Sequence, residues 1–405
     1  MKWIEGGVCA AKGFMAAGVS GGLKSPGKLD MAMVLSETDT AAAAVFTKNV
    51  VQAAPIGVSK AHLEDGSARA VIINSGNANA CAPDGEKNAQ AMCDLTAKTL
   101  GIPPEAVIVA STGVIGQTLT PQMPNIASGI EKLAEALTTD GSTQAAQAIM
   151  TTDTAVKECA LETELCGVVV HIGGIAKGSG MIHPNMGTML AFITTDVAVD
   201  AQLLQKALKT SVQRSFNRIS VDGDTSTNDT CLVMAGGEAG NAPITEENAA
   251  YQAFEDALTE LCKSLARAIA ADGEGAGHLI TCHVEGAATE ESAETIGKAV
   301  VSSSLFKAAI FGADANWGRV LCAMGYAGED FDPDKVTISF QSAAGTITVC
   351  ENGRGLNFDE DLAKKILTEA DVMVEIQMGE GAASCTCWGC DLTYEYVKIN
   401  GDYRS

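Results

Sequence analysis

Runs of apolar residues alternate with polar, glycine-containing segments along the first 285 residues. Residues 70–73 and 107–110 are short β-branched runs, and a polar segment follows each of them directly. This pattern is typical of buried strands that end in loops. Residues 125–137 carry apolar side chains at helical spacing, and Asp200 and Thr245 each precede a further helical segment that they can cap. The alternation predicts an α/β fold in which helices cover the sheets.

The pattern changes after residue 285. Residues 285–291 are small and polar, and we place a domain boundary there. The later segments predict, in order, a helix at 294–301, strands at 335–342 and 345–350, a helix at 361–367, and strands at 371–378 and 388–399. We expect a layered sandwich of sheets and helices in residues 1–285 and a smaller α+β domain in residues 286–405. A chain of 405 residues is long enough for two cores.

Composition and charge narrow the classes of partner. Hydrophobic residues make up 46% of the chain, and 50 acidic against 27 basic residues leave a net charge of -23. Such a charge repels nucleic-acid phosphates and anionic membranes. The start of the chain has no apolar signal segment, and the apolar stretch 166–176 is too short to span a bilayer. We expect a cytoplasmic protein with no nucleic-acid or membrane partner and mostly free thiols among its 13 cysteines.

The segment from residue 177 to 190 interrupts the regular pattern. Its sequence is Lys177-Gly-Ser-Gly-Met-Ile-His-Pro-Asn-Met-Gly-Thr188-Met-Leu, so glycines and a proline come directly before an apolar run. A flexible glycine joined to a hydroxyl residue at the start of a buried strand suits a strained peptide bond. Attack of the Thr188 hydroxyl on the Gly187 carbonyl would give an ester that water opens, making Thr188 a new amino terminus. Its α-amine, with a pKa of about 7.7 to 8.0, could then act as general base to the neighbouring hydroxyl.

This segment resembles the self-cleavage motif of the ornithine acetyltransferase, or glutamate N-acetyltransferase, family. Further resemblances to that family lie along the whole chain, at Asn74-Ser-Gly-Asn-Ala-Asn-Ala-Cys81, Ser111-Thr-Gly-Val-Ile-Gly116, Thr151-Thr-Asp-Thr154, Asp222-Gly-Asp-Thr-Ser-Thr-Asn-Asp-Thr230, Gly312-Ala-Asp-Ala-Asn-Trp-Gly-Arg319 and Tyr396-Val-Lys-Ile-Asn400. The resemblance implies cleavage between Gly187 and Thr188. An α chain of residues 1–187 and a β chain of residues 188–405 would then assemble as two α and two β chains.

The resemblance also implies a ping-pong acetyl transfer in arginine biosynthesis. Thr188, as nucleophile, takes acetyl from N-acetylornithine, ornithine departs, and glutamate accepts the acetyl group to give N-acetylglutamate. Acetyl-CoA is a further candidate donor, and no bound cofactor or metal is expected. By the same resemblance Thr112 and Gly113 form the oxyanion hole, which agrees with a strand-ending loop that offers a hydroxyl and a backbone N–H.

Substrate contacts are implied at six positions: Thr151, Lys177, Thr188, Glu274, Asn400 and Ser405. In an acidic protein Lys177 can offset a substrate carboxylate, and Glu274 can receive an amine. Three positions depart from the usual family pattern. Gly187 stands where alanine is common, Ser405 keeps the hydroxyl of the usual threonine, and Gly277-His278 replaces a threonine-lysine pair. We expect cleavage to survive the first change, and the affinity or the choice of donor to respond to the last.

Two other functions remain open on the sequence alone. An aminopeptidase or amidase with an amino-terminal nucleophile would use water in place of glutamate, and would release acetyl without an acceptor. A processed binding protein would bind ornithine saturably without turnover. Each of these differs from the acetyltransferase in the fate of the substrate after it binds.

Several remaining motifs resemble metal, phosphate or catalytic sites, but we expect them to have structural roles. The segment 222–233 lacks the glycine and the glutamate of a calcium loop, so we expect a hydrogen-bonded structural loop. Three cysteines in residues 385–390 have no fourth ligand beside them, which argues against zinc. The glycines before Lys24 do not have the spacing of a phosphate-binding loop. His183 is unnecessary as a base beside the Thr188 amine, and we favour a structural role for it.

Overall fold

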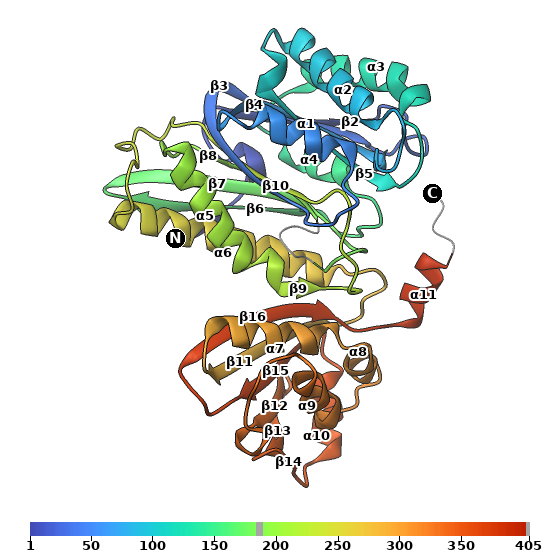
Figure 1. The fold of residues 1–405 in the computed structure, drawn as a ribbon, viewed down its shortest axis with the longest axis vertical. Helices are drawn as coiled ribbons and strands as arrows, with labels where there is room; N and C mark the ends of the chain where they lie inside the picture. Colours follow the sequence, from blue (N-terminus) through green and yellow to red (C-terminus); the bar gives the residue numbers. More distant parts are fainter. Residues whose placement is uncertain (184–188, 402–405) are drawn as a thin grey trace.

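The computed structural model describes residues 1–183 and 189–401, and their strands form two sheets, one above the other in Figure 1. The first sheet has the strand order β1-β6-β7-β8-β10-β3-β4-β5, and β2 pairs with β3. Its strands are β1 (Lys2–Ile4), β2 (Phe14–Val19), β3 (Met31–Phe46), β4 (Ser67–Asn77), β5 (Val107–Val114), β6 (Lys157–Leu165), β7 (Val168–Lys177), β8 (Leu190–Thr195) and β10 (Thr230–Ala235).

The long strand β3 folds this sheet back on itself. Its first half pairs with β2 and β4, its second half pairs with β10, and the register with β4 shifts between Leu35 and Thr40. One cluster of buried side chains draws on both halves of the folded sheet, for example Val34 of β3 on the side of β2 and β4, and Phe192 of β8 on the side of β10. The two halves therefore face each other across a shared core, to which α4 (Ser142–Ile149) also contributes.

Helices cover the two outer faces of the folded sheet (Figure 1). On one side α5 (Ala201–Gln213) and α6 (Ala249–Ala271) pack against the half that contains β7, β8 and β10. On the other side α1 (Ala54–His62), α2 (Gly85–Leu100) and α3 (Met123–Ala136) pack against the half that contains β4 and β5. These layers of helix, sheet, sheet and helix confirm the predicted sandwich. Among the helices of residues 1–183 and 189–401, none is long and apolar enough to cross a bilayer.

One of the two helix caps predicted from the sequence is correct. The Asp200 carboxylate accepts hydrogen bonds from the first backbone N–H groups of α5, at 2.8 and 3.3 Å. The prediction of Thr245 as the cap of α6 was wrong, because the Asn248 side chain accepts the corresponding bonds at 3.0 and 3.1 Å. Both residue types can cap a helix. The choice is made where the backbone turns into the helix, which is three residues later than the pattern indicated.

The second sheet has the strand order β14-β13-β12-β15-β11-β16-β9. Its strands are β9 (Ile219–Ser220), β11 (Leu279–Ala287), β12 (Thr337–Ser342), β13 (Gly345–Glu351), β14 (Arg354–Gly355), β15 (Asp371–Gln377) and β16 (Ala383–Cys390). Its helices are α7 (Glu290–Ser302), α8 (Ser304–Phe311), α9 (Trp317–Gly325) and α10 (Glu360–Leu367), and they share a second core with the sheet. This arrangement confirms the smaller α+β part.

The boundary predicted after residue 285 falls inside β11. That strand pairs along its length with β15 and β16 of the second sheet. Strand β9 also joins this sheet beside β16, although it lies far earlier in the sequence. The buried Arg218, next to β9, binds the carboxylates of Glu290 and Glu294 on α7 at 2.7 and 3.0 Å. The two sheets are thus linked by more than one connection, and the residue at which the chain divides into domains stays a prediction.

The strand predicted at residues 388–399 was wrong beyond residue 390. Strand β16 ends at Cys390, and α11 (Tyr394–Asn400) follows it. The alternation of large and charged residues in this segment imitates a strand. However, the Thr393 hydroxyl donates to the carbonyl of Gly275 at 2.7 Å, which anchors the start of the helix beside the first sheet. Figure 1 shows α11 leaving the second sheet in that direction.

Candidate active site

Segments from distant parts of the chain line one cavity of about 120 Å³. Six residues implied by the sequence resemblance line it together: Thr112, Gly113, Thr151, Lys177, Glu274 and Asn400. Gly187, Thr188 and Ser405, the other residues of that prediction, lie outside the described residues. Leu190, two residues after Thr188, begins β8 and pairs with Lys177, which lines the cavity.

Thr112 and Gly113 lie at the end of β5, beside the end of the parallel strand β4. Gly113 has a φ of 132°, and a Cβ atom there would lie 2.3 Å from the carbonyl carbon of Gly76. This close approach of two backbones requires glycine. The nearly buried hydroxyl of Thr112 accepts a hydrogen bond from the Lys177 ammonium at 3.5 Å.

Asn228 ties this strand end to its surroundings, a role that the sequence analysis missed. Its amide group donates to the carbonyl oxygens of Ala78 at 2.6 Å and Ser111 at 2.8 Å. Ser111 in turn donates from its hydroxyl to Asn74 at 2.6 Å. Asn228 also lines the cavity. The signal was present in the Asp222–Thr230 motif, but the partners of Asn228 lie more than a hundred residues away.

The predicted structural loop that begins at Asp222 holds the chain just before the cleavage segment. The Asp222 carboxylate accepts hydrogen bonds from the backbone N–H groups of Met181 at 2.6 Å and Ile182 at 2.9 Å. It also accepts one from Asp224 within its own loop, at 3.2 Å. These bonds confirm the hydrogen-bonded structural loop. They position the backbone that leads to residue 184.

His183 comes next in this segment and is half-buried. Its Nδ1 lies 3.0 Å from the hydroxyl of Ser220. Burial, and to a lesser degree the nearby Lys298 ammonium, lower the pKa of His183 to about 4. The imidazole is therefore neutral at pH 7. Its hydrogen bond with β9 agrees with the structural role that we favoured for it.

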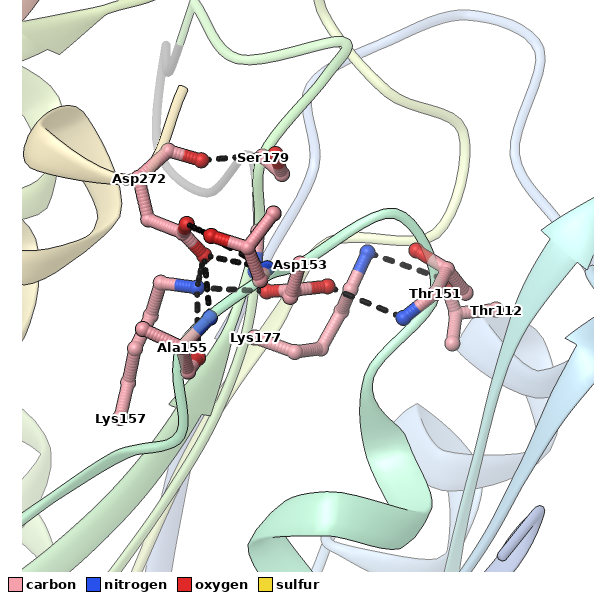
Figure 2. A network of polar contacts seen from close by, with 10 residues as sticks. Thr112, Thr151, Asp153, Ala155, Lys157, Lys177, Ser179 and Asp272 are labelled. Atoms are coloured by element: carbon pink, nitrogen blue, oxygen red, sulfur yellow. Dashed lines mark hydrogen bonds and ion pairs between the residues drawn. The ribbon is translucent and has the colours of Figure 1, made fainter. Parts of the chain in front are cut away.

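A buried charge network lies beside Thr151 and Lys177 in the wall of the cavity (Figure 2). The Asp153 carboxylate accepts hydrogen bonds from the Lys157 ammonium and the Gly178 N–H, both at 2.7 Å, and from the Thr151 N–H at 3.0 Å. Lys157 also binds the Asp272 carboxylate at 2.5 Å. The network joins the Thr151 loop, the segment that follows Lys177 and the end of α6. Asp153 belongs to one of the sequence motifs, but its role was not predicted.

Asp153 is charged in the folded protein despite its burial. Burial alone would raise the pKa of this carboxyl, but the ammonium groups of Lys177 and Lys157 together lower it well below its usual range. Its side chain is 0% exposed and that of Lys157 is 1% exposed. A buried pair of this kind is costly to break, because the remaining charge stays buried without a partner.

Replacing Asp153 with asparagine should destabilise the protein by about 3 kcal/mol, the lower end of the cost of breaking a buried ion pair. Every partner of the carboxylate is a donor, so the new NH₂ group must face another donor. Because the folded-state pKa is depressed, the stabilisation is present above a pH of about 4 and is lost as the pH falls further. Denaturant unfolding from pH 7 to pH 3 should therefore show a gap between wild type and variant that narrows at low pH.

The control for this variant is Glu247→Gln, which removes an exposed ion pair with Lys206. An exposed pair contributes at most about 1 kcal/mol. Equal destabilisation by the two substitutions would contradict the role assigned to the Asp153 network.

Glu274 and Asn400 lie together in the lining of the cavity. The Asn400 side chain donates to the Glu274 carboxylate at 2.6 Å, so α11 and the loop after α6 meet here. A Cβ atom on Gly180 would lie 2.3 Å from the Glu274 carboxyl carbon. The second glycine of the Lys177-Gly-Ser-Gly sequence is therefore needed to let Glu274 reach the cavity. Lys177 and Glu274 give the cavity one charge of each sign.

The Gly277-His278 departure lies close to Glu274 along the chain. The buried Asp391 carboxylate accepts hydrogen bonds from the backbone N–H groups of Gly277 at 2.8 Å and His278 at 3.0 Å. The His278 ring nitrogen Nδ1 is 2.9 Å from the same carboxylate. The histidine side chain therefore holds the loop that follows Glu274, and it does not line the cavity described above.

The described residues contain one group with the spacing of metal ligands, formed by His283, Glu285 and Glu375 on the second sheet. Gln377 already donates to both carboxylates, at 2.5 and 3.3 Å. None of these residues lines the active-site cavity. The polar side chains among the described residues of the cavity lining offer hydroxyl, amide, ammonium and carboxylate groups.

Comparison with known proteins identifies the family of this chain. Residues 15–405 match the ArgJ family. The chain is 50% identical to the arginine biosynthesis bifunctional protein ArgJ of Symbiobacterium thermophilum, and the alignment covers 100% of both proteins. A crystal structure of ArgJ from Bacillus halodurans is 44% identical with a TM-score of 0.50, and the match covers 52% of this chain and 97% of that one.

An ornithine acetyltransferase from Mycobacterium tuberculosis, solved as a complex with ornithine, is 40% identical with a TM-score of 0.42. That match covers 45% of this chain and 98% of the solved one. The family match extends over nearly the whole chain, and it includes every residue that lines the cavity. The chain therefore belongs to the ArgJ family.

Proposed function

We propose that the protein is a self-cleaving acetyltransferase that moves acetyl from N-acetylornithine to glutamate through an acetyl-Thr188 intermediate. The observation that carries this proposal is the shared cavity of Thr112, Gly113, Lys177 and Glu274. Lys177 also pairs with Leu190, two residues after Thr188. Membership of the ArgJ family supports a role in arginine biosynthesis. We place the activity in the cytoplasm.

The first step is cleavage of the chain. The Thr188 hydroxyl oxygen attacks the carbonyl carbon of Gly187, the C–N bond breaks, and the nitrogen takes the proton as the new α-amine. Water then hydrolyses the ester, which frees the Gly187 carboxylate and regenerates the hydroxyl. The product has an amino-terminal threonine whose amine and hydroxyl belong to one residue, so nucleophile and base are positioned together.

Strand pairing would hold the two cleaved chains together. Cleavage separates β7 from β8, but these strands pair from Ile172 with Thr195 to Lys177 with Leu190. β3 and β10, which also fall in different chains, pair as well. The α and β chains thus share one continuous sheet. An assembly of two α and two β chains is part of the proposal.

Acetyl transfer proceeds in two half-reactions. The Thr188 hydroxyl, deprotonated by its own α-amine, attacks the acetyl carbonyl of N-acetylornithine. The Thr112 hydroxyl and the Gly113 N–H stabilise the oxyanion that forms, and the departing ornithine amine takes the proton. The glutamate amine then attacks the acetyl ester, its proton passes to the Thr188 amine, and N-acetylglutamate leaves with the hydroxyl restored.

Substrate recognition follows from the charges of the cavity. The Lys177 ammonium is placed to bind the α-carboxylate that both amino acids carry, and Thr151 lies beside it. Glu274 and Asn400 can receive the side-chain ammonium of the ornithine unit. Acetyl-CoA remains a further candidate donor of the acetyl group.

Intact-mass spectrometry tests the proposal directly. The purified protein, denatured after incubation with N-acetylornithine alone, should separate into residues 1–187 and residues 188–405, the latter heavier by one acetyl group. Addition of glutamate should remove that acetyl group and produce N-acetylglutamate. Loss of acetyl to water at the same rate without glutamate would instead indicate an amidase, and an unacetylated chain would refute the mechanism.

A further inference from the structure

A second cavity of about 130 Å³ adjoins the active site. The two cavities share Gly113, Thr151 and Thr152 as walls. The outer wall of the second cavity carries two cations, Lys24 and Lys28. With a net charge of -23, the protein as a whole repels anions. Two ammonium groups beside the active site would instead attract an anion at that place.

The loop that carries these lysines is built around an internal carboxylate. The backbone N–H groups of residues 21–24 all donate to the fully buried Asp30, at distances between 2.5 and 3.0 Å. Such a series of N–H groups can bind a phosphate in other proteins. Here Asp30 occupies it, so the loop offers a ligand its lysine side chains and not its backbone.

Lys24 is fixed by this loop and retains donor capacity. Its ammonium donates to the carbonyl oxygens of Leu29 at 3.2 Å and Met150 at 2.5 Å. An ammonium has three N–H donors, so within residues 1–183 and 189–401 one is left for a ligand. Met150 directly precedes Thr151, so Lys24 is held against the active-site wall. Burial lowers the pKa of Lys24 to about 8, partly offset by Asp30, and the group is still mostly protonated at pH 7.

The two substrates of the proposed reaction have side chains of opposite charge, and the first cavity suits only one of them. The donor has a side chain that ends in an ammonium, whereas the acceptor has one that ends in a carboxylate. Glu274, bonded to Asn400, suits the ammonium but repels a carboxylate. Both substrates must nevertheless present their reacting nitrogen at the same nucleophile.

We propose that the cavity of Lys24 and Lys28 is the acceptor's own subsite, where the two ammonium groups bind the side-chain carboxylate of glutamate. The inference rests on the proposed function and deepens it. The donor side chain extends toward Glu274, and the acceptor side chain extends past Gly113 and Thr152 toward the lysines. The two side chains, of opposite charge, would thus lie in the two cavities that Gly113, Thr151 and Thr152 separate.

The test separates the two half-reactions. Acetyl-enzyme is formed with N-acetylornithine, freed of excess donor by desalting, and discharged with glutamate while intact mass reports the acetylated fraction. Lys28 is exposed, so Lys28→Glu should leave the core intact. We expect it to slow discharge by about tenfold, because charges beside a cleft raise the binding rate of an oppositely charged substrate by about 10 to 10³, and to leave acetylation by the donor within about a factor of two.

Three comparisons sharpen the result. Lys132→Glu makes the same charge change on the exposed face of α3, away from the cavity, and should alter neither rate. Glutamine as acceptor lacks the side-chain charge, so its slow discharge of the wild-type acetyl-enzyme should not fall further with Lys28→Glu. Glu274→Gln should have the opposite selectivity, and slow acetylation by N-acetylornithine more than discharge by glutamate.

The outcomes distinguish the subsite from the function. If the wild-type enzyme is acetylated and discharged but Lys28→Glu discharges at the wild-type rate, the subsite is refuted and the function stands. The same holds if only a phosphorylated thioester donor such as acetyl-CoA loses efficiency. If the wild-type enzyme is not acetylated by N-acetylornithine, the proposed function fails, and the acceptor subsite fails with it.

Discussion

Replacing Thr188 with alanine is expected to leave the protein as one uncleaved chain and to abolish acetyl transfer. The hydroxyl that attacks Gly187 is removed, so the amide never becomes an ester. Without cleavage no free α-amine forms, so nucleophile and base are lost together. Intact-mass spectrometry under denaturing conditions measures cleavage, and N-acetylglutamate formation from N-acetylornithine measures transfer.

Thr188→Ser is the matched variant, because it restores a hydroxyl at the same position. It should retain part of both activities. The alanine variant loses only the hydroxyl and a methyl group, so its thermal unfolding, measured beside that of the serine variant, shows whether the fold is kept. Acetyl transfer by a folded Thr188→Ala protein would contradict the mechanism.

Replacing Thr112 with valine should reduce the rate constants of both half-reactions by about 10² to 10³, the usual effect of removing one oxyanion donor. Valine has nearly the shape of threonine and is equally suited to the end of β5. The substitution therefore removes the hydroxyl with little change in packing. Single-turnover acetylation and discharge should both slow, while the substrate concentrations for half-maximal rate change little.

Thr152→Val is the control for this substitution. Thr152 lines the same cavity, but no oxyanion role is assigned to its hydroxyl. Its effect on acetylation by the donor, which does not use the proposed acceptor subsite, should be far smaller than that of Thr112→Val. If the two variants slow acetylation equally, or if Thr112→Val affects only one half-reaction, the oxyanion role of Thr112 is wrong.

The sequence indicated local structure well where the local signal was unambiguous. Asp200 caps α5 as expected, because a short acceptor directly before an amphipathic segment satisfies the free N–H groups of the helix. The prediction of Thr245 was wrong because Asn248, three residues later, also has a side-chain oxygen that can accept these hydrogen bonds. The strand expected up to residue 399 failed because α11 depends on an anchor to Gly275, which no local pattern contains.

Some residues of the active site were predicted from the sequence, and others were found only in the structure. The Lys177 to Leu190 motif, the nucleophile and the predicted pocket residues came from the sequence and the resemblance that it carries, and six of them line one cavity. The supporting residues did not. Asp153 has partners at Lys157 and Gly178, and Asn228 has partners at Ala78 and Ser111. Their roles depend on which strand ends meet.

The sequence by itself determined the chemistry available to this protein: a hydroxyl at a glycine-threonine junction, an acidic chain with few cations, and strands that end in polar loops. Only the tertiary structure decided which charges act together. It placed Lys177 opposite Glu274, enclosed Asp153 between lysines, and set Lys24 behind the wall of Thr151. The physical reason is that a helix or a cap depends on neighbours a few residues away, whereas the sign and strength of a buried interaction depend on groups that only the paired strands bring within a few ångströms.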